Sequence, residues 1–572
     1  MNAARALLEM LRAYGVRHVF GFPGETTLPL YLAWHDVPAV RHVLARDERS
    51  AVFMADAYSR FSGQPGVCES PGVGATHLLP GVVEAFKASV PMLVFSSDIP
   101  LGLEHRNVLT GFDQTAVFRG VTKESLTLTR GNDLPNLIRR AFRLANAGRP
   151  GPVHVRLPID VLQEQVESED LRPDLSFATC PAQRPLAQGE RIDQAAMLLS
   201  RSARPVMVCG GGALTSQAWE EVTELAELLG MPVGTTITGK GSIAEIHPLA
   251  TGVVGSRGGT SFSNAVLAQA DLVFYVGSDT DSAGTSSWSL PPLESHKKII
   301  HLDISEVEVG NSYPTDASLI GDAKATLRRL IDVLRPQAQA GAHTRAAWTA
   351  GVQEQAQNYA GRVRTWLESD VSFVHPLRLV QELWKRVPEK HVIVADPGVS
   401  AIYVSAFYRT RRPGRSTVFN YSMGALGYAI PASIGAHYAR PDHCVIALTG
   451  DGSFGLCAGE LETVSRVGGN IKIFVFDNQG FGWIKAALRF GYEPKYFACD
   501  FGAVDYVKVA QGFGLQAYRI DSNQDLGASV EKALRFEGPL LVHVKTASEH
   551  ELVPPVPEWI KKASELGLPI IY

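Results

Sequence analysis

The sequence predicts an α/β protein built from three doubly wound parallel-sheet domains. Helix-like segments alternate with short apolar runs along most of the chain, which is typical of parallel sheets covered by helices on both faces. The chain of 572 residues is also too long for a single hydrophobic core. We therefore expect domains over residues 1–165, 191–335 and 371–550, followed by a C-terminal tail over 551–572.

The first expected domain alternates helices and strands from its start. An amphipathic helix over Ala4–Tyr14 leads directly into an apolar strand, and an Ala-rich helix over Ala51–Phe61 precedes the next strand. Residues 166–190 lose this periodicity and gain proline and polar residues, which indicates a linker. The strands expected in this domain are Val16–Phe20, Gly66–Glu69, Pro91–Ser96 and Gly151–Pro158.

The central domain repeats the alternation of helix and strand. After it, a polar, Ala- and Gln-rich stretch over 336–370 predicts a helical connection to the third domain. The tail is rich in proline and then helical, so it either folds over a site or packs on the surface, and the sequence leaves both open. The central strands expected are Pro205–Cys209, Pro232–Thr235, Leu272–Val276 and Lys298–Leu302.

Composition argues against several classes of protein. Lys and Arg number 54 against 58 Asp and Glu, a net charge of -4, so no basic excess points to nucleic acid. The N-terminus lacks the long apolar core of a signal peptide, and no apolar run reaches membrane-spanning length, so we expect a cytoplasmic protein without membrane contact. The six cysteines are scattered, which favours buried free thiols in a reducing compartment.

Small oxygen-bearing side chains follow two apolar runs of the third domain. The run Cys444–Leu448 (CVIAL) leads into Gly-Asp-Gly, and the run Ile471–Phe476 (IKIFVF) ends in Asp-Asn-Gln-Gly. Asp451 and Asn478 thereby lie 27 residues apart, each where an open α/β sheet places its ligands. Carboxylate, amide and carbonyl oxygens suit Mg²⁺. Both short motifs also occur as ordinary turns, and either one alone favours that alternative.

The pair of motifs resembles the cofactor motif of thiamine-diphosphate enzymes, in which Gly-Asp-Gly precedes Asn-Asn at a similar spacing. The first Asn of that pair is Asp477 here, a departure, and the second is Asn478. The resemblance implies that Asp451, Asn478 and the carbonyl of Gly480 bind Mg²⁺ together with thiamine diphosphate. It also implies that the first domain binds the pyrimidine ring and the third the diphosphate. The likeness of segments 51–74 and 428–452 agrees with two domains of one fold, although the pattern alone fits any two α/β units equally well.

Further residues match positions at which this family contacts the cofactor. Leu426 aligns with the bulky apolar residue that holds the cofactor in its bent shape, although a buried core leucine would look the same. The cofactor-binding set that the resemblance implies is Gly398, Val399, Ser400, Gly424, Leu426, Asp451, Gly452, Ser453, Asn478, Gly480, Phe481 and Gly482.

Glu48 stands just before an amphipathic helix and follows the turn Gly21–Gly24 (GFPG). From the residues alone it is an acidic side chain of the kind favoured near a helix start. The resemblance implies instead the activating glutamate of the family. That residue hydrogen-bonds the pyrimidine ring and favours the imino form, which removes the thiazolium C2 proton. Burial raises the pKa of a carboxyl group and lets it share this proton.

Within the family, the chain looks most like the acetolactate synthase branch, on the segments GFPGETTLPLY, VCESPGVGATHLLPGVVEAF, SVPMLVFSSD and VFRGVTKES. It departs from that branch at Glu25 instead of glycine, at 109–111 instead of Phe-Gln-Glu, and at Ala487 instead of tryptophan. Glu25 either faces the substrate or simply begins a helix, and Trp483 either lines the pocket or packs. The implied substrate pocket is Glu25, Ser70, Thr110, Lys123, Trp483, Ile484 and Ala487.

The implied pocket offers few proton donors. Ile484 and Ser70 stand where decarboxylase relatives keep a catalytic Glu or His, so an intermediate would be protonated slowly. Slow protonation favours carboligation or its reverse, C–C cleavage. Glu25, His77 and Gln114 could each still donate a proton. The catalytic candidates are Glu48, Glu25 and Gln114.

The central domain raises the question of FAD, which related enzymes bind there. Cys209–Gly212 and Leu302-Asp303 fit that template, as they would fit any α/β unit. The arginine that relatives place after the run Tyr275–Gly277 is missing. The sequence therefore disfavours FAD as a cofactor but does not exclude it.

Together these observations predict a thiamine-diphosphate- and Mg²⁺-dependent lyase or carboligase acting on small 2-oxo acids or 2-hydroxy-ketones. The resemblance implies a site shared between subunits, with Glu48 from one and Asp451 and Asn478 from another, hence a homodimer at least and a homotetramer as the expected form. The alternatives are a non-oxidative 2-oxo acid decarboxylase, a flavin-linked oxidase and a non-catalytic nucleotide-binding scaffold.

Overall fold

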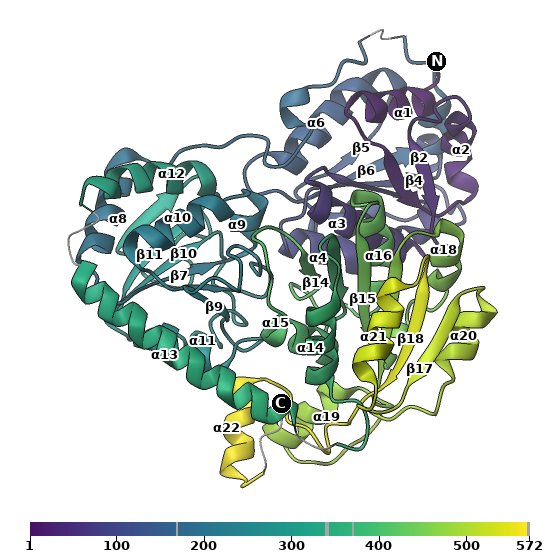
Figure 1. The fold of residues 1–572 in the computed structure, drawn as a ribbon. Coiled ribbons are helices and arrows are strands. Elements are labelled where there is room, and N and C mark those ends of the chain that lie inside the picture. The colour runs from purple at the N-terminus through teal and green to yellow at the C-terminus, as the bar shows by residue number, and fades with distance from the viewer. Residues whose placement is uncertain (168–169, 338–341, 369–370, 569–572) are drawn as a thin grey trace.

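The computed structural model describes residues 1–167, 170–337, 342–368 and 371–568. The strands of these residues form three six-stranded sheets in which all paired strands run parallel. Each sheet has a hydrophobic core on either face, with helices covering both (Figure 1). This confirms the predicted fold class of three doubly wound α/β domains.

The first sheet has the strand order β2-β1-β3-β4-β6-β5. Helices α1, α2, α6 and α7 pack on one face, and α3 and α4 on the other. The strands are β1 (His18–Gly21), β2 (Arg41–Leu44), β3 (Gly66–Ser70), β4 (Met92–Asp98), β5 (Ser125–Thr127) and β6 (Pro152–Pro158). The helices are α1 (Ala3–Ala13), α2 (Leu28–Trp34), α3 (Glu48–Ser62), α4 (Leu79–Lys87), α5 (Gln114–Arg119), α6 (Leu134–Asn146) and α7 (Ile159–Gln163).

The central sheet has the order β12-β11-β10-β7-β8-β9. Its strands are β7 (Pro205–Cys209), β8 (Val233–Thr235), β9 (Ala250–Val253), β10 (Leu272–Val276), β11 (Lys298–Asp303) and β12 (Ala317–Ile320). Its helices are α8 (Gly189–Arg201), α9 (Gly211–Thr215), α10 (Trp219–Leu229), α11 (Ser261–Gln269) and α12 (Ala323–Leu334). The long helix α13 (Ala342–Leu367) then confirms the predicted helical connection and runs along the central domain toward the third (Figure 1).

The third sheet has the order β14-β13-β15-β16-β18-β17. Its strands are β13 (His391–Ala395), β14 (Thr417–Phe419), β15 (Cys444–Gly450), β16 (Ile471–Asp477), β17 (Gln516–Ile520) and β18 (Leu540–Lys545). Its helices are α14 (Pro376–Arg386), α15 (Val399–Phe407), α16 (Ala429–Ala439), α17 (Asp451–Phe454), α18 (Glu460–Val467), α19 (Gly482–Gly491), α20 (Tyr506–Gly512) and α21 (Leu526–Arg535). The tail contains α22 (Pro557–Glu565), a segment that the sequence also predicts to be helical.

Helices α3 and α16 pack side by side and join the first and third domains (Figure 1). One core cluster contains apolar side chains of both helices and of both sheets, from Phe20 in β1 to Val475 in β16. The helices approach closely because α16 carries Gly435, where a Cβ atom would stand 2.0 Å from the carbonyl oxygen of Met54. The close packing of small residues makes the first and third domains one hydrophobic unit.

A buried charge network lies at this junction. Arg60 pairs with Asp56 at 2.8 Å and with Glu84 at 3.1 Å, and the Tyr428 hydroxyl donates to Asp56 at 2.6 Å. Glu84 also accepts the backbone N–H of Met423 at 2.7 Å. Removing one partner of a buried ion pair costs on the order of 3–5 kcal/mol, because the other charge stays buried without compensation. The network therefore fixes the loop after β14 against the first domain.

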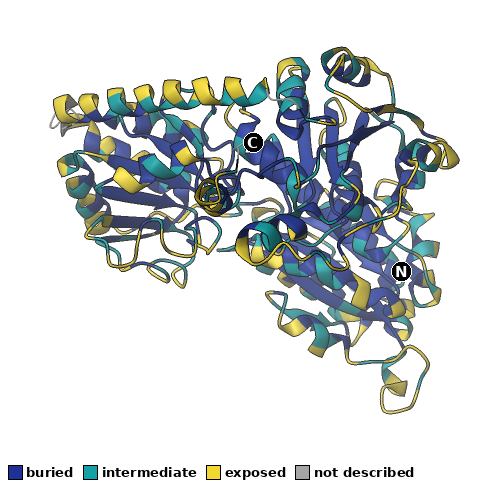
Figure 2. Cartoon of the chain, turned by 90° about the horizontal axis from the view of Figure 1, so that it is seen from below, coloured by how far each residue is buried: buried dark blue, intermediate teal, exposed yellow. Residues whose placement is uncertain are grey.

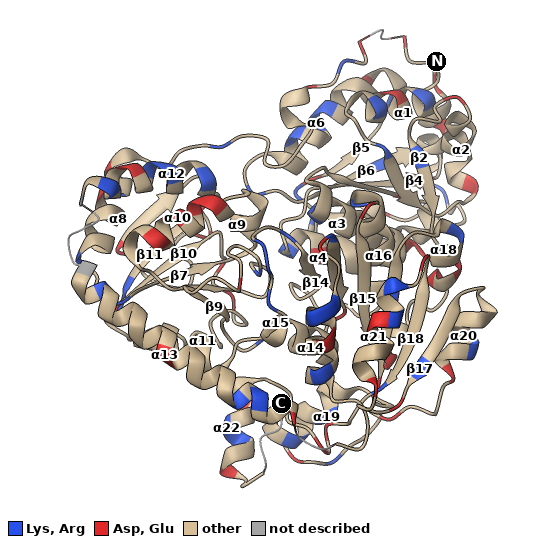
Figure 3. Cartoon of the chain, viewed as in Figure 1, with Lys and Arg blue, Asp and Glu red and all other residues tan. Residues whose placement is uncertain are grey.

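The surface carries charges of both signs, interspersed for example on α14 and α21 (Figure 3). Exposed residues lie along the outer faces of helices such as α13, while the sheets are mostly buried (Figure 2). All six cysteines are buried and free of disulfides, as expected. Among the described helices, none is both long and apolar enough to cross a bilayer. Parts of the predicted linker (168–169), helical connection (338–341, 369–370) and tail (569–572) lie outside the described residues.

Candidate functional site

Four adjacent strands of the third sheet end beside one another and carry the segments predicted to bind the cofactor. Because β14, β13, β15 and β16 are parallel neighbours, their carboxyl ends meet at one edge of the sheet, where open α/β sheets bind ligands. The segments that follow these ends are Gly398–Ser400 after β13, 424–426 after β14, Asp451–Ser453 after β15 and 478–482 after β16.

Asp451 lies buried at the start of α17, with 6% of its surface exposed. Its carboxylate accepts the backbone N–H groups of Gly480 at 3.0 Å and Gly452 at 2.8 Å, so the turns after β15 and β16 are tied together. Burial raises the pKa of Asp451 to about 7, although these two hydrogen bonds act to lower it. Binding a cation beside this carboxylate would stabilise its charged form. The carboxylate therefore suits a divalent cation.

The loop of Gly480 turns sharply back toward Asp451. Gln479 adopts a left-handed conformation with φ of 57°, and the Gly480 carbonyl accepts the N–H of Gly482 at 2.9 Å. Phe481 then donates its N–H to the Cys499 carbonyl at 2.8 Å. The predicted metal residues Asp451 and Gly480 are thus in direct contact, and Asn478 is two residues away on the same loop.

Asn478 contacts a residue that no sequence motif singles out. Its side-chain amide donates a hydrogen bond to Glu549, which follows β18 and is 4% exposed. Glu549 sits in a polar stretch (TASEHE) without motif or periodicity, so no local signal separates it from a surface acid. Only the pairing of β16 with β18 brings it to the site.

Asp477, which stands where the family has asparagine, is neutralised within the domain. It accepts hydrogen bonds from His543 at 2.8 Å and from Lys545 at 3.2 Å, both on the neighbouring strand β18. Burial alone would raise the pKa of Asp477, but these two partners bring it below its ordinary value. The negative charge that Asp477 adds at this position of the family pattern is thereby balanced by the ammonium group of Lys545.

Hydrogen bonds from backbone N–H groups to side-chain hydroxyls link the remaining segments of this edge. Gly398 has φ of 112° and donates its N–H to the hydroxyl of Tyr421 at 3.1 Å. The Ser453 hydroxyl accepts the N–H of Gly427 at 2.8 Å, which links the turn after β15 to the loop after β14. Ser400 is buried and Leu426 is half-buried. Hydrogen bonds therefore connect all four segments along this edge of the sheet.

Glu48 begins α3 of the first domain and is 7% exposed. Its carboxylate lies 3.1 Å from Nδ1 of the exposed His77, and the preceding Asp47 caps the helix by accepting the N–H of Arg49 at 2.8 Å. Within the described part of one subunit, no hydrogen bond or ion pair joins Glu48 to Asp451 or Asn478.

The predicted pocket residues of the first domain differ in exposure. Glu25 lies exposed on a short 3-10 turn (Glu25–Thr27), and Thr110 is exposed in a left-handed conformation with φ of 69°. Ser70, at the end of β3, is fully buried. The surface that carries Glu25 and Thr110 is open to solvent in the single chain.

Gln114 is fully buried and belongs to a polar chain inside the first domain. Its amide oxygen accepts from Ser96, and its amide nitrogen donates to the Ser97 carbonyl at 3.1 Å. Ser96 also contacts Nε2 of His154 at 2.6 Å. Burial lowers the pKa of His154 to about 3, so this imidazole is neutral near pH 7. Both the oxygen and the nitrogen of the Gln114 side-chain amide are therefore hydrogen-bonded inside the first domain.

Lys123 lies apart from the other pocket candidates. Its ammonium donates to the carbonyls of Ala147 and Arg149, each at 2.8 Å, just past the C-terminal end of α6. Cations are favourable at this end of a helix, where carbonyl groups lack partners. The contacts of Lys123 thus hold the end of α6 and do not bring it to Glu25 or Ser70.

Trp483, Ile484 and Ala487 lie on α19, directly after the cofactor loop. Trp483 contacts the guanidinium of Arg257, 4.7 Å from its ring centroid, and the tilted ring of Trp559 in α22, with ring centroids 4.5 Å apart. Ala487 packs in the same cluster, whereas Ile484 is 47% exposed. The tail therefore packs on α19, and Trp483 is part of that packing.

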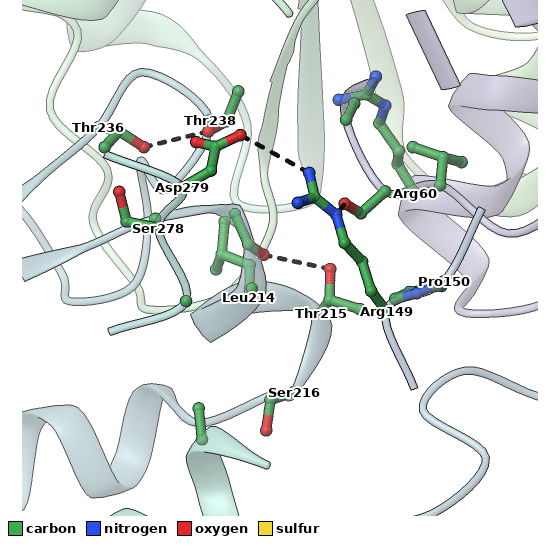
Figure 4. A pocket seen from close by; sticks show the side chains of 18 of the residues that line it. Arg60, Arg149, Pro150, Leu214, Thr215, Ser216, Thr236, Thr238, Ser278 and Asp279 are labelled. Atoms are coloured by element: carbon green, nitrogen blue, oxygen red, sulfur yellow. Dashed lines mark hydrogen bonds and ion pairs between the residues drawn. The ribbon is translucent and has the colours of Figure 1, made fainter. Parts of the chain in front are cut away.

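The carboxyl edge of the central sheet borders a cavity of about 400 Å³. Pockets of this size hold small molecules. Arg149 of the first domain reaches into it and pairs with Asp279 at 3.6 Å (Figure 4). Several residues that fit the FAD-binding template of related enzymes line this cavity, namely Gly210, Gly211, Gly212, Leu302 and Asp303.

Purified protein is expected to carry FAD well below one molecule per subunit, because the arginine expected after Tyr275–Gly277 is absent. The measurement is the visible absorbance of the protein, with flavin released by heat and quantified by fluorescence. Growth with added riboflavin is the control for limited supply. Stoichiometric FAD would contradict this prediction and favour a flavin-linked reaction.

Family models match each of the three domains. The N-terminal TPP binding domain of thiamine pyrophosphate enzymes matches residues 1–117, the central domain matches 192–330, and the C-terminal TPP binding domain matches 396–544. A probable acetolactate synthase large subunit of Methanocaldococcus jannaschii is 32% identical over 567 residues, covering 97% of this chain and 94% of the relative. One of Methanococcus aeolicus is 31% identical over 583 residues, with the same coverage.

A bacterial relative gives the same picture. The acetolactate synthase isozyme 1 large subunit of Escherichia coli is 29% identical over 570 residues, covering 99% of this chain and 98% of the relative. The three domain models and the relatives, which align over nearly the full length of the chain, all indicate the same family. The chain belongs to the thiamine pyrophosphate enzyme family, with distant full-length homology to acetolactate synthase large subunits.

Proposed function

We propose that this protein is a thiamine-diphosphate- and Mg²⁺-dependent carboligase or C–C lyase acting on small 2-oxo acids or 2-hydroxy-ketones. The observation that carries the proposal is the direct link between the Asp451 carboxylate and the Gly480 loop, at neighbouring strand ends of a thiamine pyrophosphate enzyme. The acetolactate synthase relatives support a 2-oxo acid as the substrate class.

The residues at this edge fit the cofactor and its cation. Asp451, Asn478 and the Gly480 carbonyl would bind Mg²⁺, because they offer the hard oxygen ligands that this ion prefers. The buried Asp451 carboxylate, whose pKa burial raises to about 7, is a charge that a cation would compensate. When bound, thiamine diphosphate supplies the carbanion chemistry at the substrate carbonyl. The protein then has to hold, orient and shield the reacting groups.

We further propose that the complete site is shared between two subunits. Glu48 would come from one subunit, and Asp451 and Asn478 from the other, which requires a homodimer at least. The exposure of Glu25 and Thr110 in the single chain supports this, because residues that the resemblance places in the substrate pocket lie open to solvent unless another subunit covers them. Light scattering of the purified protein measures whether it is a dimer or a tetramer.

A product screen distinguishes the proposal from the simple decarboxylase. The holoenzyme is incubated with a panel of 2-oxo acids, with and without aldehyde acceptors, and the products are identified by mass spectrometry. The proposal requires new C–C bonds, or cleavage of 2-hydroxy-ketones. Aldehyde and CO₂ alone would establish the decarboxylase instead, and no turnover of any substrate despite bound cofactor would favour a non-catalytic protein.

The variant Glu25→Gly is expected to shift the product ratio several-fold toward ligation onto 2-oxo acids, with nearly unchanged cofactor affinity. A carboxylate beside the acceptor repels an anionic 2-oxo acid, and two unit charges about 4 Å apart interact by about 1 kcal/mol even in water. The measurement is a competition between a 2-oxo acid and a neutral aldehyde as acceptors, with both products quantified.

The variant Glu25→Gln is the matched control, because it removes the charge and keeps the size. If charge decides the acceptor, Gln and Gly shift the ratio alike. If only Gly shifts it, the side chain limits space. An unchanged ratio and rate in both variants would show that Glu25 only begins the 3-10 turn at Glu25–Thr27.

A further inference from the structure

Glu549 is an acidic residue inside the candidate metal site that the family motif does not include. It follows β18 and is only 4% exposed. Its carboxylate accepts a hydrogen bond from the amide nitrogen of Asn478, and Arg489 of α19 donates to its backbone carbonyl. Its second carboxylate oxygen is buried and has no hydrogen-bond partner among the described residues. Such a buried acid needs a structural or functional reason.

The loop of the candidate metal site is built around this carboxylate. Gly482 passes so close that a Cβ atom there would stand 2.0 Å from Glu549 Oε1 and 2.3 Å from the Asn478 amide nitrogen. Only glycine therefore lets the loop place Asn478 and Glu549 together. Lys485, one turn into α19, is buried with an ion pair to Asp500 at 2.6 Å and supplies positive charge nearby.

The chemistry of the pair decides which end of the Asn478 amide faces the loop. An asparagine side chain has a donating nitrogen and an accepting oxygen, and a carboxylate only accepts. The nitrogen must therefore turn toward Glu549, which leaves Oδ1 directed away from it. Since Asn478 Oδ1 is the atom that a hard cation would bind, Glu549 holds the amide in the orientation that a Mg²⁺ ligand needs.

We propose that Glu549 is a positioning residue for the metal site, which acts by fixing the orientation of the Asn478 amide. The inference rests on the proposed function, because it requires Asn478 to be a Mg²⁺ ligand. Glu549 itself is not assigned as a ligand. Its substitution should therefore weaken cation binding only as long as Asn478 is present.

The test compares Glu549→Gln with Asn478→Ala and with the double variant. Glutamine keeps the shape but offers both a donor and an acceptor, so it no longer dictates the orientation of Asn478. Mg²⁺ is titrated calorimetrically into full-length protein with saturating thiamine diphosphate, and Mn²⁺ binding is followed by paramagnetic resonance. We expect E549Q to weaken cation affinity about 10–100-fold, the usual cost of losing a group that orients a metal ligand. The double variant should bind no more weakly than Asn478→Ala alone.

Glu558→Gln is the matched control, because Glu558 is an exposed acid of the C-terminal tail that follows Glu549, and the cation affinity of this variant should equal that of the parent. Thermal unfolding of each variant without cofactor reports whether the fold survives. If E549Q does not fold, Glu549→Asp keeps the acceptor but shortens it by one methylene, and we expect it to weaken cation binding as well.

The outcomes separate this inference from the proposed function. If Asn478→Ala leaves cation affinity unchanged, the metal assignment fails and this inference fails with it. If Asn478→Ala weakens binding but folded E549Q binds like the parent, only the role of Glu549 is overturned. An equal loss from E549Q in the parent and in the Asn478→Ala background would also overturn it, since Glu549 would then act independently of Asn478.

Discussion

Replacing Asp451 by alanine is expected to weaken the joint binding of Mg²⁺ and thiamine diphosphate by more than about 100-fold, the upper end of what loss of an outer partner of a metal ligand costs. The variant removes a proposed direct ligand and leaves the cation under-coordinated beside the diphosphate. It also removes the acceptor for the N–H groups of Gly480 and Gly452. Calorimetry with each component at saturating concentration of the other measures the loss.

Two further variants show whether the effect of Asp451→Ala is specific. Asp451→Asn keeps an acceptor for the Gly480 N–H but lacks the charge, so it should hold the loop and still bind the cation weakly. Asp442→Ala removes an exposed carboxylate near the opposite end of β15 and should bind like the parent. Parental cofactor affinity in Asp451→Ala would remove the metal assignment.

The variant Glu48→Gln is expected to bind cofactor within a few-fold of the parent and to lose at least about 100-fold of its activity, the lower end for loss of a positioned acid–base group. An amide keeps the size of the side chain but cannot share a proton with the pyrimidine ring. The direct measurement is H/D exchange at thiazolium C2 of the bound cofactor, followed by NMR.

The neighbouring acid supplies the control for Glu48→Gln. Asp47→Asn removes a charge one residue away and keeps a good N-cap for α3, because Asn and Asp cap helices equally well. It should retain activity and C2 exchange. Exchange in Glu48→Gln as fast as in the parent would rule out the activating role, whatever the effect on turnover.

The strands that the sequence predicts are interior strands. Each expected strand agrees with one in the structure to within two residues at either end. All of them lie inside a sheet, where both faces are buried and the segment reads as a continuous apolar run. The expected runs did not include two interior strands, β13 and β18, or the six edge strands β2, β5, β9, β12, β14 and β17. Several of these are short and partly exposed, such as β2 and β17, so their residues carry no clear apolar pattern.

The candidate cation site was predictable because its parts sit at strand ends. An apolar run followed by Gly-Asp-Gly, and a second run followed by Asp-Asn-Gln-Gly, are local features of the chain. In a parallel sheet both ends lie at one edge, so neighbouring strands bring Asp451 and Asn478 together without further information. The departure at Asp477 was visible as well, but its partners His543 and Lys545 lie on β18, 66 and 68 residues away.

The sequence by itself determined the fold class, the family and the strand-end motif, because these depend on local periodicity and on short motifs. Only the tertiary structure decided which side chains meet across strands and domains. It paired Glu549 with Asn478, enclosed Gln114 in a polar chain, placed Lys123 at the end of α6, and packed the tail on Trp483. These contacts join residues far apart in the chain, and each arises from the packing of surrounding strands and helices, which no local pattern records.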